Sequence, residues 1–360
     1  MDSLLQDWPE PVVCVQSLSE SGLSTIPDRY IKPPSDRPSL SITSKQNQHS
    51  IPVVDLRGLM DDVAGCRATI QAISAACREW GFFQVVNHGV SVELMERMRE
   101  TWRSFFQLPI KVKQAYANLP KTYEGYGSRL GVEKGAILDW GDYYFLNLMP
   151  ASARSRQMHW PAQPCSLREI TNEYEREVAK LCQTLMKVLS ISLGLDVDYL
   201  QNAFGGGGGA GECLRVNYYP KCPQPDLALG LSPHSDPGGL TVLLADHRVG
   251  GLQVRKGDAW VTVQPLPAAL VINIGDQIQV LSNCMFKSVE HRVLTNPTNE
   301  RISMAFFYNP RSDLPLAPAQ ELVTPERPSL YRPMTFDEYR MYIRKKGPRG
   351  KTQVESLKAQ

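Results

Sequence analysis

The sequence predicts an α+β protein in which a helical N-terminal half packs against an antiparallel β-barrel or jelly roll. In the first 204 residues, the long segments carry apolar residues at helical spacing. From residue 213 onward, short runs rich in β-branched and aromatic residues recur roughly every ten residues, separated by Gly, Pro, Asn or Asp. With 360 residues, the chain can bury a large core in one or two domains.

The N-terminal half is expected to alternate helices with short strands. Residues 91–109 are predicted to be helical because apolar residues recur at steps of three and four, with Ser91 as the N-cap. The longest predicted helix, 166–195, has the same spacing and stops at Gly194. The other expected elements are a short strand at 50–59, a helix followed by a strand at 67–90, a glycine-broken loop at 123–130 and an aromatic strand at 138–150.

The C-terminal half is expected to contain short strands and one closing helix. Residues 335–347 form that helix, and the glycine tract 205–211 is expected to be a flexible turn. The β-rich runs are 213–220, 240–246, 251–263, 269–283, 287–294 and 301–310.

Composition and charge favour a small-molecule partner. The formal net charge is +2 and no long basic run occurs, so neither a nucleic-acid nor a membrane partner is expected. No apolar run approaches the length of a membrane span, and the N-terminus lacks the basic end and apolar core of a signal peptide. Eight scattered cysteines without a C-x-x-C pair predict reduced thiols. We therefore expect a monomer in the cytoplasm, with the nucleus left open as a second compartment.

His234 and Asp236 suggest a metal site. Residues two apart on an extended chain point to the same face, and both lie just before an apolar run. A third ligand should come from another strand, and His291 lies in such a run. Two histidines and one carboxylate leave open coordination positions, as in non-haem Fe(II) oxygenases. An isolated H-x-D is more often an ordinary polar pair at a strand end, so its context must decide.

Arg301 and Ser303 share one face of a predicted strand with apolar Ala305 and Phe307, so this face is expected to point inward. A buried arginine needs an anion, and its forked donors suit a carboxylate. The alternative is a surface charge on an edge strand.

Together these motifs resemble those of the plant 2-oxoglutarate-dependent dioxygenases. The residues that carry the resemblance are "NYYP" (217–220), H-x-D (234–236), His291 and R-x-S (301–303), with "IPVVDL", "REWGFFQVVNHGV" and "SFFQLP" in the N-terminal half. The resemblance covers roughly residues 20–345.

The resemblance implies a double-stranded β-helix that carries Fe(II), with a helical N-terminal region and a closing C-terminal helix. It implies that O₂ and 2-oxoglutarate are consumed, that succinate and CO₂ leave, and that a substrate C–H bond is hydroxylated, with ascorbate as reductant. No catalytic residue beyond the metal ligands is implied. The implied metal ligands are His234, Asp236 and His291, and the implied 2-oxoglutarate ligands are Arg301, Ser303, Tyr219 and Asn217.

On this basis the chain divides into five segments. They are an N-terminal arm (1–49), an N-terminal dioxygenase-type domain (50–165), a long connecting helix region (166–204), the Fe(II)/2-oxoglutarate jelly-roll core (205–315), and a C-terminal helix with a basic tail (316–360).

Three further arginines suggest an acidic substrate. Arg215 has the same parity as Asn217 and should face the barrel interior, while Arg340 and Arg344 form one stripe with Phe336 on the closing helix. Since Arg301 already serves the co-substrate, the three would bind a second carboxylate. Alternatively, Arg340 and Arg344 pair with Glu338 or complement the helix C-terminus. The expected aromatic walls of the pocket are Tyr143, Phe145, Phe307 and Phe336, each of which could equally be ordinary core.

Within the family, the chain most resembles the jasmonate-inducible oxygenases, which hydroxylate jasmonic acid at C-12 and so inactivate the hormone and lower jasmonate signalling in defence. The alternatives are a flavonoid oxidase of the flavonol or anthocyanidin synthase type, another plant hormone oxidase, or a binding protein that has lost turnover. The flavonoid oxidases share D-W-x-D-Y, here 139–143, but a polyphenol has no carboxylate for three arginines.

Overall fold

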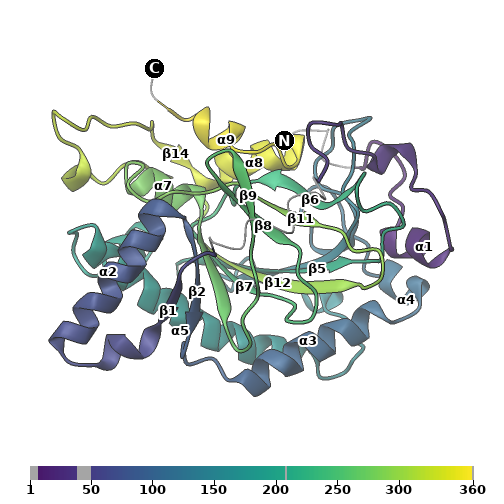
Figure 1. Cartoon of the computed structure of the whole chain (residues 1–360), viewed down its shortest axis with the longest axis horizontal. Coiled ribbons are helices and arrows are strands. Elements are labelled where there is room, and N and C mark those ends of the chain that lie inside the picture. The colour runs from purple at the N-terminus through teal and green to yellow at the C-terminus, as the bar shows by residue number, and fades with distance from the viewer. Residues whose placement is uncertain (1–6, 39–49, 207–208, 359–360) are drawn as a thin grey trace.

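The computed structural model describes residues 7–38, 50–206 and 209–358. Two β-sheets face each other, and helices cover the outer face of the larger one (Figure 1). The larger sheet contains, in spatial order, β1 (Val53–Asp55), β2 (Phe82–Val86), β10 (Leu270–Ile274), β7 (Leu240–Leu244), β12 (Arg301–Asn309), β5 (Gly211–Tyr219), β4 (Asp142–Met149) and β3 (Gly125–Gly127). The smaller sheet contains β6 (Leu229–His234), β11 (His291–Leu294), β8 (Leu252–Lys256) and β9 (Ala259–Thr262). The strands β13 (Pro315–Leu316) and β14 (Met334–Thr335) form a separate pair.

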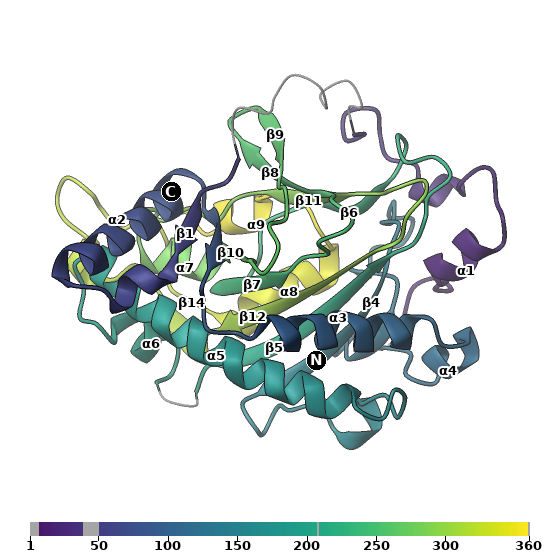
Figure 2. The same ribbon diagram turned by 60° about the horizontal axis from the view of Figure 1, so that its bottom comes forward.

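The long helices pack on the large sheet. Helices α3 and α5 run side by side along strands β5 and β12 (Figure 2). The helices are α1 (Val15–Glu20), α2 (Val63–Glu79), α3 (Val92–Phe106), α4 (Ile110–Gln114), α5 (Leu167–Ser192), α6 (Tyr199–Ala203), α7 (Asp276–Leu281), α8 (Phe336–Lys346) and α9 (Thr352–Glu355). Short 3₁₀ turns lie at Asp28–Tyr30, Leu56–Met60, Gln157–His159 and Gln320–Leu322.

Strand parity divides the large sheet into two chemically different faces. Even-numbered residues of β5 and β12, such as Val216 and Met304, join the main hydrophobic core with Trp102 of α3. Odd-numbered residues point the other way, into the space between the two sheets. The helices therefore bury the apolar face, and the polar motif residues are left for the interior of the barrel.

The two longest predicted helices lie where the apolar spacing places them. Ser91 caps α3 by accepting a hydrogen bond of 3.4 Å from the Leu94 N–H. Helix α5 ends before Gly194, whose φ of +75° lies in the left-handed region that favours glycine.

The sequence-based assignment of 269–283 as a strand run was wrong in its second half. Only Leu270–Ile274 is a strand, and Asp276–Leu281 is helix α7. All six residues of α7 are buried, including the polar Asp276, Gln277 and Gln279, so the segment lacks the solvent-exposed polar face that distinguishes a helical period from an extended one.

Other segments carry more regular structure than expected. The predicted loop 123–130 contains β3, which pairs with β4, and the arm contains α1. The arm residues 39–49 and the glycines at 207–208 lie outside the described residues. The division into five segments stays a prediction. Strand β2 pairs with β10, so strands from two of those segments share one sheet.

Candidate metal centre and substrate cavity

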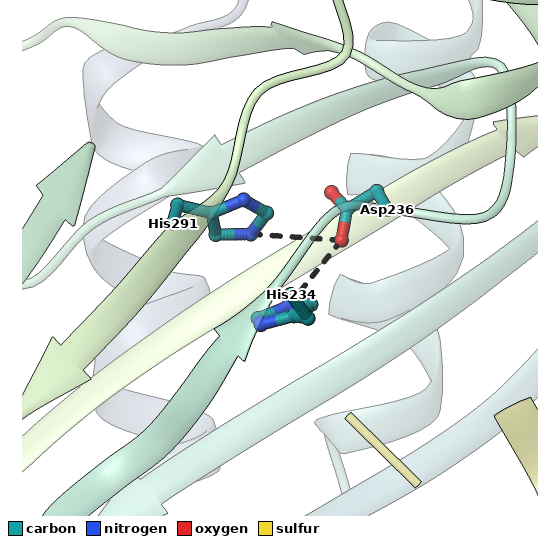
Figure 3. Close-up of side chains that lie close together, drawn as sticks. All are labelled: His234, Asp236 and His291. Atoms are coloured by element: carbon teal, nitrogen blue, oxygen red, sulfur yellow. Dashed lines mark ion pairs between the residues drawn. The ribbon is translucent and has the colours of Figure 1, made fainter. Parts of the chain in front are cut away.

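The smaller sheet brings the predicted metal-binding side chains together. His234 ends β6 and His291 begins β11, and the two residues are direct partners in the antiparallel register. The Nε2 atom of each histidine lies 3.6 Å from Oδ1 of Asp236 (Figure 3). Their ligand atoms all lie within 4.8 Å of one another, and no other such His/Cys/Asp/Glu group occurs within residues 7–38, 50–206 and 209–358.

Backbone carbonyls fix the orientation of both imidazoles. Nδ1 of His234 lies 2.9 Å from the Ser232 carbonyl, and Nδ1 of His291 lies 3.2 Å from the Val289 carbonyl. Because a carbonyl only accepts, each Nδ1 carries the proton and each Nε2 presents its lone pair to the centre of the cluster.

Two side chains that the sequence analysis missed hold the carboxylate of Asp236. Thr241 Oγ1 donates to Oδ2 over 2.6 Å, and Asn273 Nδ2 donates to the same oxygen over 2.8 Å. Thr241 lies on β7 and Asn273 on the adjacent β10, where they are register partners. Polar residues within two otherwise apolar strands were the available signal, but only the register shows that they meet at Asp236.

The electrostatics of the cluster suit a divalent metal. Burial, together with the nearby His291, lowers the pKa of His234 to about 4, with Asp236 opposing the shift. Burial acts to raise the pKa of Asp236, but the two histidines, Thr241 and Asn273 outweigh it and lower the pKa. At neutral pH, His234 is therefore unprotonated and Asp236 is ionised, which are the forms that bind metal. Two imidazoles and one carboxylate fit Fe(II) with open positions.

The N-terminus of α7 holds the loop that carries Asp236. Three consecutive N–H groups donate to loop carbonyls. Gly275 donates to Gly239 over 2.7 Å, Asp276 donates to Asp236 over 2.8 Å, and Gln277 donates to Gly238 over 2.9 Å. A Cβ atom at Gly275 would lie 2.3 Å from the Gly238 carbonyl oxygen, so this close approach requires glycine.

The predicted co-substrate residues lie together on the inward face of β5 and β12. Arg301 is the register partner of Tyr219, and Ser303 is the partner of Asn217. The Arg301 guanidinium lies 5.5 Å from the Tyr219 ring centroid and donates to Ser303 Oγ over 3.2 Å. Arg301 is only 3% exposed, and its Nε has no hydrogen-bond partner. Within the described ranges, no carboxylate lies at ion-pair distance from Arg301. A buried cation in this state calls for an anionic ligand.

Arg215 lies two residues from Asn217, on the same strand face. Its guanidinium stacks over the Tyr143 ring at 4.2 Å from the centroid, and its buried Nε has no hydrogen-bond partner. Tyr143 is held in turn by Asn118, which donates to its hydroxyl over 2.7 Å. The inward orientation expected of Arg215 is therefore what the structure has.

Helix α8 brings Arg340 and Arg344 toward the same region. Both arginines influence the pKa of Cys213, because burial raises this pKa to about 12 and the two guanidinium groups act to lower it. Cys213 shares the inward face of β5 with Arg215. Arg340 forms an ion pair with Asp337, and its Nε is buried without a hydrogen-bond partner. Burial lowers the pKa of Arg344, and the neighbouring charge of Arg340 adds to this effect.

Glu338 is not the partner of these arginines. It completes a capping box with Thr335 at the start of α8. Within the described ranges, Arg340 but not Arg344 forms an ion pair, and its partner is Asp337 and not Glu338.

A cavity of about 750 Å³ opens beside Arg215, whereas Arg340 and Arg344 are not among the residues that line it. Its floor includes four of the predicted site residues, Tyr143, Arg215, Asn217 and Tyr219. Phe145 and Phe307 lie on the inward face as register partners of Arg215 and Cys213, but they are not among the residues that line the cavity. Phe336 packs instead into a hydrophobic cluster with Tyr331, Tyr339 and Val354. The N-terminal arm and the C-terminal tail complete the rim, with Lys32, Pro33, Asp36, Pro348, Arg349 and Gly350.

The comparisons identify the class of protein to which this fold and site belong. The chain belongs to the 2OG-Fe(II) oxygenase superfamily, whose family model matches residues 210–310. A second model, described as the non-haem dioxygenase in morphine synthesis N-terminal, matches residues 51–164. The resemblance seen in the sequence is therefore confirmed, together with the jelly-roll fold and the use of Fe(II) and 2-oxoglutarate by an oxidoreductase.

Particular relatives cover nearly the whole chain. Jasmonate-induced oxygenase 1 of Arabidopsis thaliana is 59% identical over 98% of this chain and 87% of its own length. Jasmonate-induced oxygenase 3 of the same species is 58% identical over 99% of both chains. Flavanone 3-dioxygenase 2 of Oryza sativa subsp. japonica is 41% identical over 90% of this chain and 92% of its own. The crystal structure of JOX2 in complex with 2OG, Fe, and JA superposes with a TM-score of 0.91 at 59% identity, covering 98% of this chain and 100% of that one.

Within the described ranges, every helix is too short or too polar to cross a bilayer.

Proposed function

We propose that this enzyme hydroxylates jasmonic acid to 12-hydroxyjasmonic acid, consuming 2-oxoglutarate and O₂ and releasing succinate and CO₂. The observation that carries the proposal is the pair of buried, unpartnered guanidinium nitrogens of Arg215 and Arg340, in addition to that of Arg301. Arg301 is a buried cation that serves 2-oxoglutarate, and the unpartnered Nε atoms of the half-buried Arg215 and Arg340 suit a second carboxylate. The identity of 58–59% to the jasmonate-induced oxygenases, and the JA present in the JOX2 crystal, support this choice of acid.

In the proposed site, His234, Asp236 and His291 hold Fe(II). Thr241 and Asn273 keep Oδ1 of Asp236 turned toward the metal, while backbone carbonyls hold the two imidazoles. When bound, the Fe(II) supplies the oxidative chemistry that the side chains of this chain lack.

The remaining residues bind and orient the two acids. Arg301 and Ser303, assisted by Tyr219 and Asn217, hold the distal carboxylate of 2-oxoglutarate. Arg215, Arg340 and Arg344 hold the carboxylate of the substrate, and Tyr143, Phe145 and Phe307 contact its apolar body, with Phe336 supporting α8 from the cluster beneath it. Because the carboxylate and the apolar body of the substrate are both held, one part of the substrate chain lies beside the metal. The surrounding protein limits the access of water.

A flavonoid oxidase is the second candidate, supported by the 41% identity to a flavanone dioxygenase. The shared D-W-x-D-Y motif does not favour it, because both aspartates have other partners in the structure. Asp139 accepts a hydrogen bond from Lys32 over 2.8 Å, and Asp142 accepts from the N–H groups of Val15 and Gln16 over 2.8 and 2.9 Å. These contacts fasten the N-terminal segment beside the cavity, which Lys32, Asp139 and Asp142 also line.

The setting of the reaction is part of the proposal. All eight cysteines are unpaired, which supports a reducing compartment such as the cytoplasm or the nucleus. We further propose that the enzyme acts as a monomer, that its activity lowers jasmonate signalling in defence, and that ascorbate keeps its iron reduced.

A substrate comparison tests the proposal. Purified enzyme receives Fe(II), 2-oxoglutarate and ascorbate with jasmonic acid, methyl jasmonate or a dihydroflavonol, and products are analysed by mass spectrometry and NMR. We expect a product one oxygen heavier from jasmonic acid, hydroxylated at C-12, and far less from the ester. Oxidation of the dihydroflavonol with none of the jasmonic acid would favour the flavonoid alternative. Absence of substrate-dependent succinate release would favour a binding protein.

A further inference from the structure

Tyr339 and Arg340 are neighbours on α8 but contact different parts of the site. Arg340 belongs to the proposed acid-binding group, whereas Tyr339 is 2% exposed and its hydroxyl donates to Oδ2 of Asp276 over 2.6 Å. The helix that carries the acid-binding arginines is therefore hydrogen-bonded to the start of α7.

Asp276 also contacts the loop that carries the metal-binding residues. Ser235, which lies between His234 and Asp236, donates from its hydroxyl to Oδ2 of Asp276 over 3.2 Å. The Asp276 N–H donates to the Asp236 carbonyl over 2.8 Å. Asp276 is fully buried, so these bonds are shielded from competing water.

The buried carboxylate of Asp276 thus connects α8, which carries the acid-binding arginines, to the loop that carries His234 and Asp236. The far end of α8 is fastened elsewhere, because the Arg344 carbonyl accepts from the Tyr123 hydroxyl over 3.1 Å and the Arg344 guanidinium donates to the Lys121 carbonyl over 2.9 Å. The bond from Tyr339 to Asp276 sets the position of α8 relative to the metal loop.

We propose that Tyr339 and Asp276 are positioning residues that fix the distance from the substrate carboxylate to the metal and so select the carbon that is hydroxylated. The inference rests on the proposed function. Because the carboxylate is the charged anchor of the substrate, a small shift of α8 moves a different C–H bond toward the metal. A displacement of about 1 Å can cost about a hundredfold in rate.

The test compares Tyr339→Phe with Tyr331→Phe. Tyr331 is also 2% exposed and also bonds to α7, because Gln279 Nε2 donates to its hydroxyl over 2.8 Å. Each substitution removes one buried hydroxyl, but Tyr331 contacts neither the metal loop nor the acid-binding arginines through that bond. The measurements are the ratio of hydroxylated product to succinate, the position of the hydroxyl by NMR, the KM for 2-oxoglutarate and the Tm.

For Tyr339→Phe we expect the ratio of product to succinate to fall about threefold or more and hydroxylation to spread to neighbouring carbons, with the KM for 2-oxoglutarate unchanged. Tyr331→Phe should lower the Tm while keeping the parent ratio and the single product. A parent ratio and a single product in Tyr339→Phe would overturn the inference, whatever its Tm.

A second pair of variants covers the case in which Tyr339→Phe does not fold. Asp276→Asn keeps an acceptor for Tyr339 and should retain the parent ratio, whereas Asp276→Ala should lose it. Equal ratios in the two variants would overturn the inference. Failure of the unmodified enzyme to hydroxylate jasmonic acid would instead reject the proposed function, so the two failures are distinguishable.

Discussion

Thr241 donates a hydrogen bond of 2.6 Å to Oδ2 of Asp236, and this bond turns the other carboxylate oxygen toward His234 and His291. Thr241 is 4% exposed, so water does not replace the bond when it is lost. The residue lies on the large sheet while both histidines lie on the smaller one, so the metal site spans the barrel.

Thr241→Val should weaken Fe(II) binding about tenfold to a hundredfold, because the carboxylate loses a partner that fixes its orientation. Anaerobic titration with Fe(II) in the presence of 2-oxoglutarate, followed by the metal-to-ligand absorption band, measures the affinity. Thr241→Ser keeps the hydroxyl and serves as the matched control. Equal Fe(II) affinity in the Val and Ser variants would contradict the assigned role.

His234→Ala and Asp236→Ala should each abolish turnover and the absorption band, because the metal loses one of its three protein ligands. His88→Ala is the control histidine, because its Nε2 lies 3.0 Å from the Ala268 carbonyl and it is not part of the metal-binding group. It should retain the band. Succinate release at the parent rate by either ligand variant would refute the assignment of the metal site.

Arg301→Lys should raise the KM for 2-oxoglutarate about tenfold or more, because an ammonium group cannot reproduce the paired donors of a guanidinium. The KM for jasmonic acid at saturating 2-oxoglutarate should change little. Steady-state kinetics with each acid varied in turn separates the two effects. A rise confined to the KM for jasmonic acid would reverse the roles given to Arg301 and Arg215.

Arg344→Met should weaken binding of the acid substrate by about 1–2 kcal/mol, or roughly fivefold to thirtyfold in KM. This loss is smaller than the roughly 2–5 kcal/mol expected for a fully buried charge pair, because Arg344 is only half-buried. Arg340→Met should have a smaller effect, because Arg340 already has Asp337 as a partner. Methyl jasmonate provides the internal control, since its loss of the carboxylate should remove the difference between parent and variant. An equal loss for acid and ester would argue against a carboxylate contact.

The inward-facing residues could be predicted from sequence because strand parity is strict. The family resemblance implied Tyr219 and Asn217, and the observed register pairs them with Arg301 and Ser303. Parity with Asn217 and Tyr219 then predicted that Arg215 faces the interior. Helical spacing located α3 and α5 because each has one apolar and one polar face.

The parts that could not be predicted lack such a periodic signal. Helix α7 is buried on all sides, so its apolar pattern fits a strand as well as a helix, and the contacts of Asp276 were missed with it. The roles of Thr241 and Asn273 depend on which strands are adjacent, and β7 and β10 are separated by β8 and β9 in the chain. Phe336 follows helical spacing with Arg340, but that spacing does not show which neighbour a side chain packs against.

Glu212 provides a test of the electrostatics away from the catalytic site. It lies on the helix-facing side of β5 and is 9% exposed. Burial raises its pKa to about 7, with the nearby Glu175 adding to the effect and Arg154 opposing it. The folded protein therefore holds a proton on Glu212 more tightly than the unfolded chain does. This contribution to stability is complete below the unfolded pKa of about 4.5 and is lost as the pH rises through about 7.

Glu212→Gln should therefore be more stable than the parent at pH 8, by up to about 3 kcal/mol, since a pKa difference of about 2.5 corresponds to that energy at 1.36 kcal/mol per unit. The difference should shrink as the pH falls and be absent near pH 4, where the parent residue is protonated in both states. Urea unfolding at pH 8, 6.5 and 5 measures the trend. The exposed Glu326, replaced by Gln, is the control and should stay within about 0.5 kcal/mol of the parent throughout. A constant offset between Glu212→Gln and the parent across this range would show that packing, and not the titration of Glu212, causes the difference.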